Sequence, residues 1–112
     1  MYAAIYAWKV IPGREEPFRA GWRRVTEALQ EQRASFGSRL HRSADGRVLA
    51  YALWPDEETW KAAMAGDSLD PEGIAMMHDS AEPDGVELPD GRRTPIVATG
   101  DVTDDLLRSP GT

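Results

Sequence analysis

The 112-residue sequence contains no cysteine. A chain without thiols has no disulfide, no thiolate zinc ligand and no thiol nucleophile, so these three kinds of site are excluded. The absence of cysteine also fits a reducing compartment, and the cytoplasm is therefore the predicted location. A single domain of this length buries roughly two thirds of its unfolded surface, so it can fold without crosslinks.

Long apolar runs are also missing. No segment approaches the roughly 20 apolar residues of a membrane span, and the first residues, MYAAIYAWKVIPG, lack the pattern of a signal peptide. We therefore expect a soluble, unprocessed protein that does not bind a membrane.

Residues that hold metals or cofactors are sparse. The two histidines, His41 and His78, lie far apart, and the acidic residues fall mostly in predicted caps and loops, so no metal site is predicted. The chain has no phosphate-binding loop, no G-x-S-x-G elbow and no dinucleotide fingerprint. We accordingly predict no metal and no cofactor.

The formal net charge is -6, and it is unevenly spread. Residues 1–54 carry nine Lys or Arg and five acids, a net +4, whereas residues 55–112 carry four and fourteen, a net -10. Nucleic-acid binding requires a clustered basic surface free of nearby acids, so no nucleic-acid partner is expected. The opposite charges of the two halves favour contacts within one chain or between subunits.

Strand and helix signals alternate along the chain. Two-residue apolar alternation predicts strands at residues 2–11, 36–42, 47–54 and 96–102. Helical spacing and N-cap residues predict helices that begin near Glu15 and Glu57 and a third over residues 71–81. The polar, turn-rich stretch at 82–93 is predicted to be a loop. We expect one domain over residues 1–102, followed by a tail at 103–112.

The order strand, helix, strand, strand, helix, strand is that of the ferredoxin-like split βαβ unit, an α+β fold whose antiparallel sheet carries helices on one face only. The opposite face of this sheet is also apolar. Small monomers rarely expose a contiguous patch of this kind, so we predict a homodimer whose sheets face each other. The residues expected between the two sheets are Ile5, Leu49, Tyr51 and Leu53.

Three segments occur in a characteristic order over about residues 4–66: a first strand that ends in PGREEPF, the hairpin GSRLHRSADG and the strand-to-helix corner YALWPDEETW. Together they resemble the antibiotic biosynthesis monooxygenase family, within the dimeric α+β barrel superfamily. The resemblance implies a dimeric barrel. It also implies a pocket between helices and sheet, in which some members oxygenate polycyclic phenols without a cofactor.

The resemblance also has implications for individual positions. Trp54 matches a tryptophan of the anthrone-type oxygenases, and Trp60 matches the aromatic residue six positions later. Ala50 stands where those oxygenases have an asparagine, so the amide that would orient a substrate oxygen is absent. Tyr6 and Ala63 stand where the haem-degrading members have an asparagine and a tryptophan, so the resemblance does not extend to haem degradation.

The face of the sheet that meets the helices combines large rings with small alanines. Such a face either leaves a cavity for a planar aromatic ligand or interdigitates with the helices as a solid core, and both readings stay open. The residues predicted to bind a substrate are Trp8, Trp22, Ala50, Trp54, Trp60, Met64 and Met77.

Two residues are candidates for catalysis. Histidine is the side chain most often used to take up a proton near neutral pH, and His78 lies on the helix expected to roof the pocket. Tyr6 is placed to hydrogen-bond a phenolic substrate. The alternative for His78 is an exposed or purely structural histidine. Arg39 and His41 are assigned a structural role at the sheet edge or the subunit interface.

The predicted function is that of a cofactor-free monooxygenase acting on a planar phenol or quinone. A cofactor-free isomerase or cyclase would need the same residues. A non-catalytic dimeric module that binds an aromatic ligand, and a dimer with a filled pocket that acts through its surface, are the remaining alternatives.

Overall fold

The computed structural model describes residues 1–107, so residues 108–112 of the predicted tail lie outside the described part of the chain. Its elements, in chain order, are β1 (Tyr2–Val10), α1 (Glu15–Gln32), β2 (Gly37–Arg42), β3 (Arg47–Trp54), α2 (Glu57–Ala65), α3 (Pro71–Ser80), β4 (Ala81–Pro83), β5 (Val86–Glu87), β6 (Arg93–Thr94) and β7 (Ile96–Asp101).

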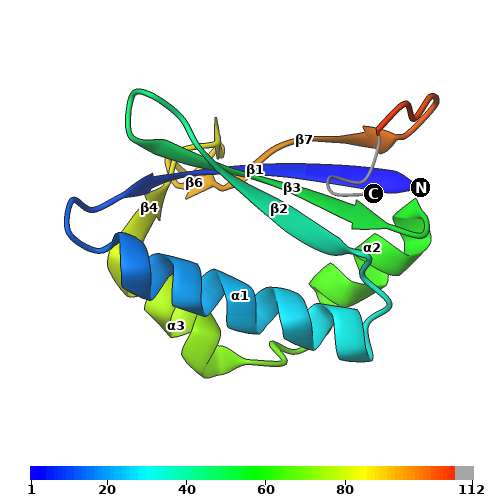
Figure 1. Cartoon of the computed structure of the whole chain (residues 1–112), viewed down its shortest axis with the longest axis horizontal. Coiled ribbons are helices and arrows are strands. Elements are labelled where there is room, and N and C mark those ends of the chain that lie inside the picture. Colours follow the sequence, from blue (N-terminus) through cyan, green and yellow to red (C-terminus); the bar gives the residue numbers. More distant parts are fainter. Residues whose placement is uncertain (108–112) are drawn as a thin grey trace.

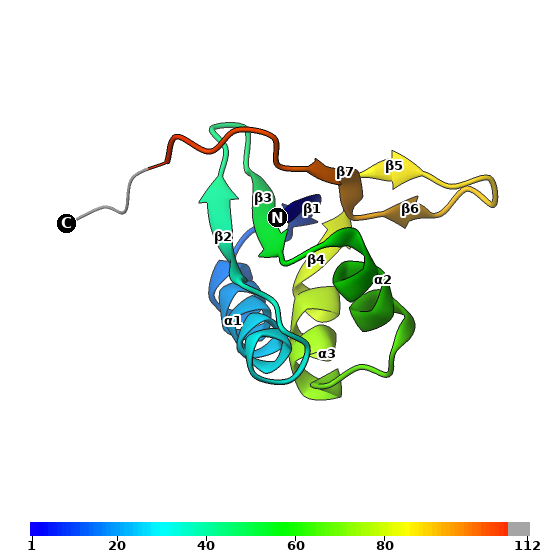
Figure 2. The same ribbon diagram turned by 90° about the vertical axis from the view of Figure 1, so that its right-hand side faces the viewer.

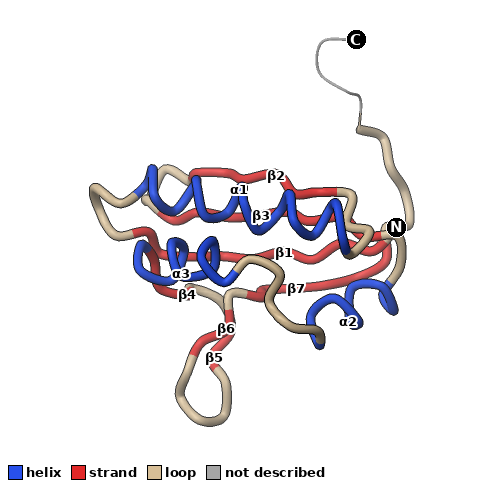
Figure 3. The backbone as a smooth tube through the Cα atoms, turned by 90° about the horizontal axis from the view of Figure 1, so that it is seen from below, coloured by secondary structure: helices blue, strands red, loops and turns tan. Residues whose placement is uncertain are grey.

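The main sheet is antiparallel, with the order β2-β3-β1-β4, and β7 also pairs with β1. Strand β7 pairs with residues 2–6 of β1 and β4 pairs with residues 8–10, so the two short strands share one edge. All three helices of the described residues lie on the same face of this sheet (Figure 1). Seen from the helix side, α1 runs beside β2 and β3, whereas α3 and α2 lie toward β4 and β7 (Figure 3). The predicted ferredoxin-like α+β fold is confirmed.

The helix starts follow the predicted cap chemistry. The carboxylate of Asp56 accepts a hydrogen bond from the Thr59 backbone N–H at 2.7 Å, and that of Asp70 accepts one from the Gly73 N–H at 3.1 Å. Helices α1 and α3 pack closely at Gly21, where a Cβ atom would lie 2.7 Å from the Gly73 carbonyl oxygen. A glycine is therefore required at residue 21, and this contact holds α3 in place beneath the sheet.

The prediction that residues 82–93 form a loop is wrong. This stretch contains most of β4 and all of β5, and β6 begins at its last residue. β5 and β6 form a small hairpin that projects from the edge of the sheet (Figure 2). Strands of two or three residues are too short for an alternation to be recognised, and the Pro-Asp-Gly residues that indicate a loop also form hairpin turns.

Helices lie over one face of the sheet and not over the other within the described residues. On the helix side Tyr2, Ala4 and Trp54 are buried, whereas the outer face has no helix over it within residues 1–107. The register pairs Ile5 with Tyr51, and Arg39 of the edge strand β2 also lies opposite Tyr51. The outer face is formed by Ile5, Leu49, Tyr51 and Leu53, which are only partly buried, with Arg39 and His41 at its edge.

No helix within the described residues is long and apolar enough to cross a membrane.

Candidate functional site

A hollow of about 350 Å³ lies between the inner face of the sheet and the helices. Its floor includes Ala50 and Ala52, whose short side chains leave space that the rings of Trp8 and Trp54 enclose. The walls are almost wholly apolar, and the volume falls within the range of small-molecule sites. The inner face is therefore hollow, and the reading of a solid core does not hold.

The hollow brings together most of the residues predicted from the sequence. Eight of the nine line it: Tyr6, Trp8, Trp22, Ala50, Trp54, Met64, Met77 and His78. The ninth, Trp60, does not line the hollow and instead contacts Tyr6.

Trp60 holds the hydroxyl group of Tyr6. Its indole N–H donates a hydrogen bond to the Tyr6 oxygen at 3.2 Å, and its ring packs against Tyr2 with centroids 5.5 Å apart. An indole N–H can only donate, so the Tyr6 proton must point away from Trp60. That proton is directed toward the sulfur of Met64, with 4.0 Å between oxygen and Sδ. Because a thioether is a weak acceptor, a ligand oxygen can displace it.

Burial determines the protonation of Tyr6. Desolvation raises the pKa of its phenol above the ordinary value of 10.0, and the hydrogen bond from Trp60 offsets part of this rise. At neutral pH the phenol therefore keeps its proton. Tyr6 can act as a hydrogen-bond donor to a ligand oxygen, and it cannot act as a phenolate base.

His78 lies at the mouth of the hollow. Its side chain, on α3, lines the hollow and is exposed, as are Ile74 at 45% and Met64 at 43%. A ligand seated on the alanine floor would meet His78 only with the part that extends toward solvent.

Sequence reasoning missed the polar groups at the other end of the hollow. Ser38 lies opposite Ala52 in the register of β2 and β3, and Ser35 precedes the same strand. The Oγ of Ser38 and the Nε1 of Trp54 are buried and have no hydrogen-bond partner among the described residues. Unpaired buried polar atoms are uncommon, so a small rearrangement toward a ligand oxygen would satisfy them. The alternation of β2 already placed Ser38 on this face, whereas no pattern indicated Ser35.

Within residues 1–107, no three His, Asp or Glu side chains come close enough together to hold a metal ion.

No protein-family model and no curated protein sequence matches this chain. Solved structures do match. A variant of SnoaB, a cofactor-independent oxygenase from Streptomyces nogalater, has a TM-score of 0.69 and 15% identity over 96% of this chain and 97% of its own. Tetracenomycin F2 cyclase from Streptomyces glaucescens, a type-II polyketide cyclase, has a TM-score of 0.60 and 15% identity over 97% and 100%.

A third crystal structure, described as an antibiotic biosynthesis monooxygenase, has a TM-score of 0.56 and 15% identity over 75% of this chain and 90% of its own. Likenesses at such low identity concern the architecture. The chain therefore has the ferredoxin-like α+β fold of the antibiotic biosynthesis monooxygenases, as the resemblance over about residues 4–66 predicts.

Proposed function

We propose that the protein is a cofactor-free monooxygenase that acts on a planar phenol or quinone-type metabolite bound in the inner hollow. One observation carries the proposal: an apolar hollow with indole rings in its walls and an alanine floor contains the hydroxyl group of Tyr6, whose direction is set by the hydrogen bond from Trp60. Planar aromatic rings stack favourably on indoles, and apolar pockets with few polar groups are typical of small-molecule sites.

In this reaction Tyr6 is the hydrogen-bond donor and His78 is the proton acceptor. Tyr6 donates its proton in a hydrogen bond to the phenolic oxygen of the substrate and stabilises the negative charge that develops there. His78, at the mouth, accepts a proton from the activated carbon of the substrate. The enclosing rings fix the orientation of the substrate and keep water away from the anion.

The substrate itself supplies the electrons. After a CH₂ group loses one proton, its carbanion reduces O₂ and a carbon–oxygen bond forms, which gives a peroxide. Loss of water from this peroxide leaves a carbonyl group, so one oxygen atom enters the product and the other enters water. The four electrons come from the two C–H bonds that are broken.

We further propose that residues 1–102 form one domain and that two copies pair through their outer sheet faces, forming a cytoplasmic homodimer with a barrel between the sheets. The support is the partly exposed apolar set of Ile5, Leu49, Tyr51 and Leu53, over which no helix of residues 1–107 lies. Contiguous apolar patches of this kind mark interaction surfaces.

A cyclase or isomerase reaction in the same hollow is the second candidate. Ala50 provides no amide beside the substrate, and a structure with the same fold is a polyketide cyclase. Ring closure would use the Tyr6 donor and the His78 acceptor without O₂. The third candidate is a non-catalytic module that binds an aromatic ligand.

Oxygen uptake with a reduced anthrone tests the proposal. The wild type is expected to consume one O₂ per carbonyl formed, and Tyr6→Phe to lower the rate about ten-fold, the value of a lost hydrogen bond to a charged oxygen. His78→Ala is expected to lower it as well. Tyr51→Phe removes a hydroxyl from the outer face and is the matched control, which should leave the rate unchanged.

Each contrary result favours one alternative. Conversion without O₂ uptake would contradict the monooxygenase and support the cyclase. Quenching of tryptophan fluorescence by the anthrone without any conversion would support the binding module.

A further inference from the structure

Hydroxyl groups lie at two separate ends of the inner hollow. Tyr6 is on β1, and its hydroxyl contacts side chains of α2, which lies on the side of β1 away from β2 (Figure 3). Ser38 is on the edge strand β2, with β3 between it and β1. The register aligns Ser38 with Ala52, which is aligned with Ala4 of β1. The Cα atoms of Ser38 and Tyr6 therefore lie two strand spacings and two residues apart, roughly 12 Å.

The end of the hollow near β2 contains two unpaired polar atoms. The Oγ of Ser38 and the Nε1 of Trp54 are buried and have no hydrogen-bond partner among the described residues, and both side chains line the hollow. Trp54 as a whole is 1% exposed. Because Ser38 lies opposite Ala52, Trp54 is its diagonal neighbour on the same face of the sheet. Diagonal neighbours lie about 7–8 Å apart, within reach of an aromatic side chain, so the two groups can meet on one ligand oxygen.

The chemistry of these two groups limits what a ligand can place there. An indole N–H can only donate, whereas a serine hydroxyl can donate or accept. A carbonyl oxygen on the ligand would accept from both, and a phenolic hydroxyl would accept from Trp54 and donate to Ser38. Ser35 does not belong to this pair, because its Oγ accepts the Gly37 N–H at 3.0 Å and so holds the start of β2.

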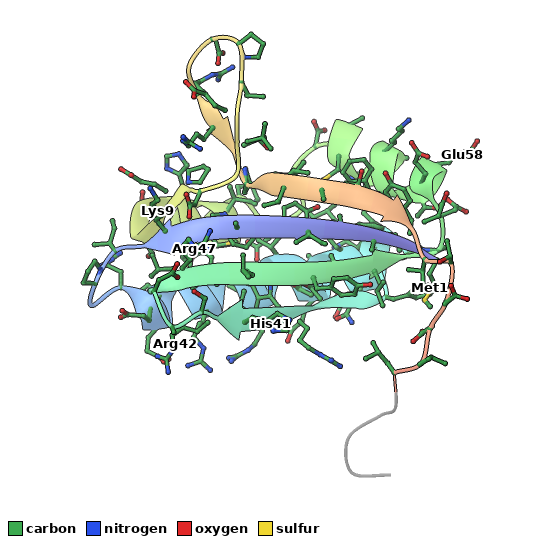
Figure 4. The ribbon with its side chains drawn as sticks, turned by 90° about the horizontal axis from the view of Figure 1, so that it is seen from above. Met1, Lys9, His41, Arg42, Arg47 and Glu58 are labelled. Atoms are coloured by element: carbon green, nitrogen blue, oxygen red, sulfur yellow. The ribbon has the colours of Figure 1, made fainter. Side chains whose placement is uncertain are left out.

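Charged side chains are kept away from the hollow. No Lys, Arg, Asp or Glu of residues 1–107 lines it. Lys9, His41 and Arg47 belong to the same strands, but they alternate with the inner residues and therefore point to the outer face (Figure 4). A charged ligand group at either inner end would be buried without a partner of opposite charge, which is strongly unfavourable. The hollow therefore suits a neutral ligand.

We propose that Ser38, together with Trp54, determines the specificity of the hollow by binding a second oxygen of the ligand, at the end opposite to Tyr6. The ligand is a neutral planar ring system that carries a hydroxyl or carbonyl oxygen at each of two opposite ends. The proposal rests on the function proposed above for the hollow, and it specifies which phenols and quinones fit.

The binding of two simple naphthols tests the proposal. 2-Naphthol carries one hydroxyl, and 2,6-dihydroxynaphthalene, the diol, carries a second hydroxyl at the opposite end. Neither has the CH₂ group that the proposed oxygenation requires, so titration calorimetry under nitrogen measures binding alone. The wild type is expected to bind the diol about ten-fold more tightly than 2-naphthol, because the second oxygen adds hydrogen bonds with Ser38 and Trp54.

Substitution of Ser38 separates its hydroxyl from the packing of the site. Ser38→Ala should weaken binding of the diol about five-fold and of 2-naphthol less than two-fold, because 2-naphthol still reaches Tyr6. Ser38→Thr keeps a hydroxyl and should keep the preference for the diol to within about two-fold of the wild type. Tyr6→Phe should weaken diol binding by a similar factor, and the double variant with Ser38→Ala by the product of the two factors, because groups this far apart act independently. Tyr51→Phe, on the outer face, should leave both affinities unchanged.

A third ligand tests the preference for neutral groups. 6-Hydroxy-2-naphthoate has a carboxylate in place of one hydroxyl of the diol. It should bind at least about ten-fold more weakly than the diol, because no cation of the described lining residues can pair with the carboxylate.

Four results would overturn the proposal: equal affinity of the wild type for the diol and 2-naphthol, equal weakening of both by Ser38→Ala, a carboxylate that binds as tightly as the diol, or no binding of either naphthol. Oxygen uptake with the anthrone is a separate measurement. If it is retained while the preference for the diol is absent, only this proposal fails, and if it is absent while the preference depends on Ser38, only the monooxygenase fails.

Discussion

The two faces of the sheet are made by alternate residues of the same strands, yet they differ in how they are covered. Ala50 lies on the floor of the hollow, and its neighbour Leu49 lies on the uncovered outer face. Both faces are apolar. The inner face has its helix layer but keeps an internal space, whereas the outer face has no helix over it within residues 1–107. Apolar character alone therefore does not distinguish the two faces, whereas side-chain size does, because the inner face has alanines at its centre and the outer face has leucines.

The largest expected effect is on the outer face. Leu49→Asp would place an unpaired carboxylate between the two sheets of the proposed dimer. We expect the dimer Kd to rise on the order of 100-fold, as measured by light scattering over a concentration series. The exposed control Ala62→Asp on α2 should leave the Kd unchanged. An intact Leu49→Asp dimer would show that the outer face is not the interface.

The next effect is on the inner face. Ala50→Phe places a ring in the hollow, so substrate turnover and tryptophan quenching should fall at least about 30-fold. Because the space already exists, the free energy of unfolding should change by less than about 1 kcal/mol. Leu49→Phe enlarges the adjacent residue on the opposite face and should leave turnover unchanged. A loss of about 3 kcal/mol in Ala50→Phe would mean that the floor has no room for a ring.

A smaller effect on turnover is expected at Trp60, which does not line the hollow but contacts Tyr6. Trp60→Phe keeps a ring against Tyr2 but removes the N–H that donates to Tyr6. That hydrogen bond lowers the pKa of Tyr6, so its loss should raise the pKa further and reduce turnover about five-fold. Phenolate absorbance in a pH titration, with Tyr6→Phe subtracted, measures the shift. Trp22→Phe also changes a tryptophan near the hollow and should leave the pKa of Tyr6 as it is.

The smallest expected effect is a change in thermal stability when the N-cap of α3, the helix that carries His78, is removed. Asp70 caps α3 and pairs with Arg24 at 2.8 Å, and Asp70→Ala should lower Tm by about 5 °C at pH 7. Hydrogen bonds from Arg24 and from the Gly73 N–H hold the pKa of Asp70 below 3.8. Its stabilising effect is therefore present above about pH 4 and is lost as the pH falls through the lowered pKa.

Thermal unfolding of both proteins from pH 7 to pH 2 checks this prediction. The difference in Tm between the wild type and Asp70→Ala should shrink toward acid. Asp67→Ala is the control, because only the backbone oxygen of Asp67 takes part in a described contact. A constant difference across the titration would contradict a contribution from the charged carboxylate.

Much of the architecture was predictable from local patterns. Alternation in residues 2–11 and 47–54 identified the two central strands and assigned Ala50 and Leu49 to opposite faces, because the side-chain period of a strand is two. Asp56 and Asp70 marked helix starts, because a capping carboxylate acts within three residues. Of the nine site residues that the sequence predicted, eight line the hollow.

Other features depended on distances between layers. The sequence left a solid core and a cavity equally open, because the space above Ala50 depends on how near the helices approach the sheet, and no local pattern determines that distance. Trp60 has the same helical spacing as a lining residue, but the packing of α2 turned it toward Tyr2 and Tyr6. Local patterns determined which side chains face inward, whereas the tertiary structure decided where they leave empty space.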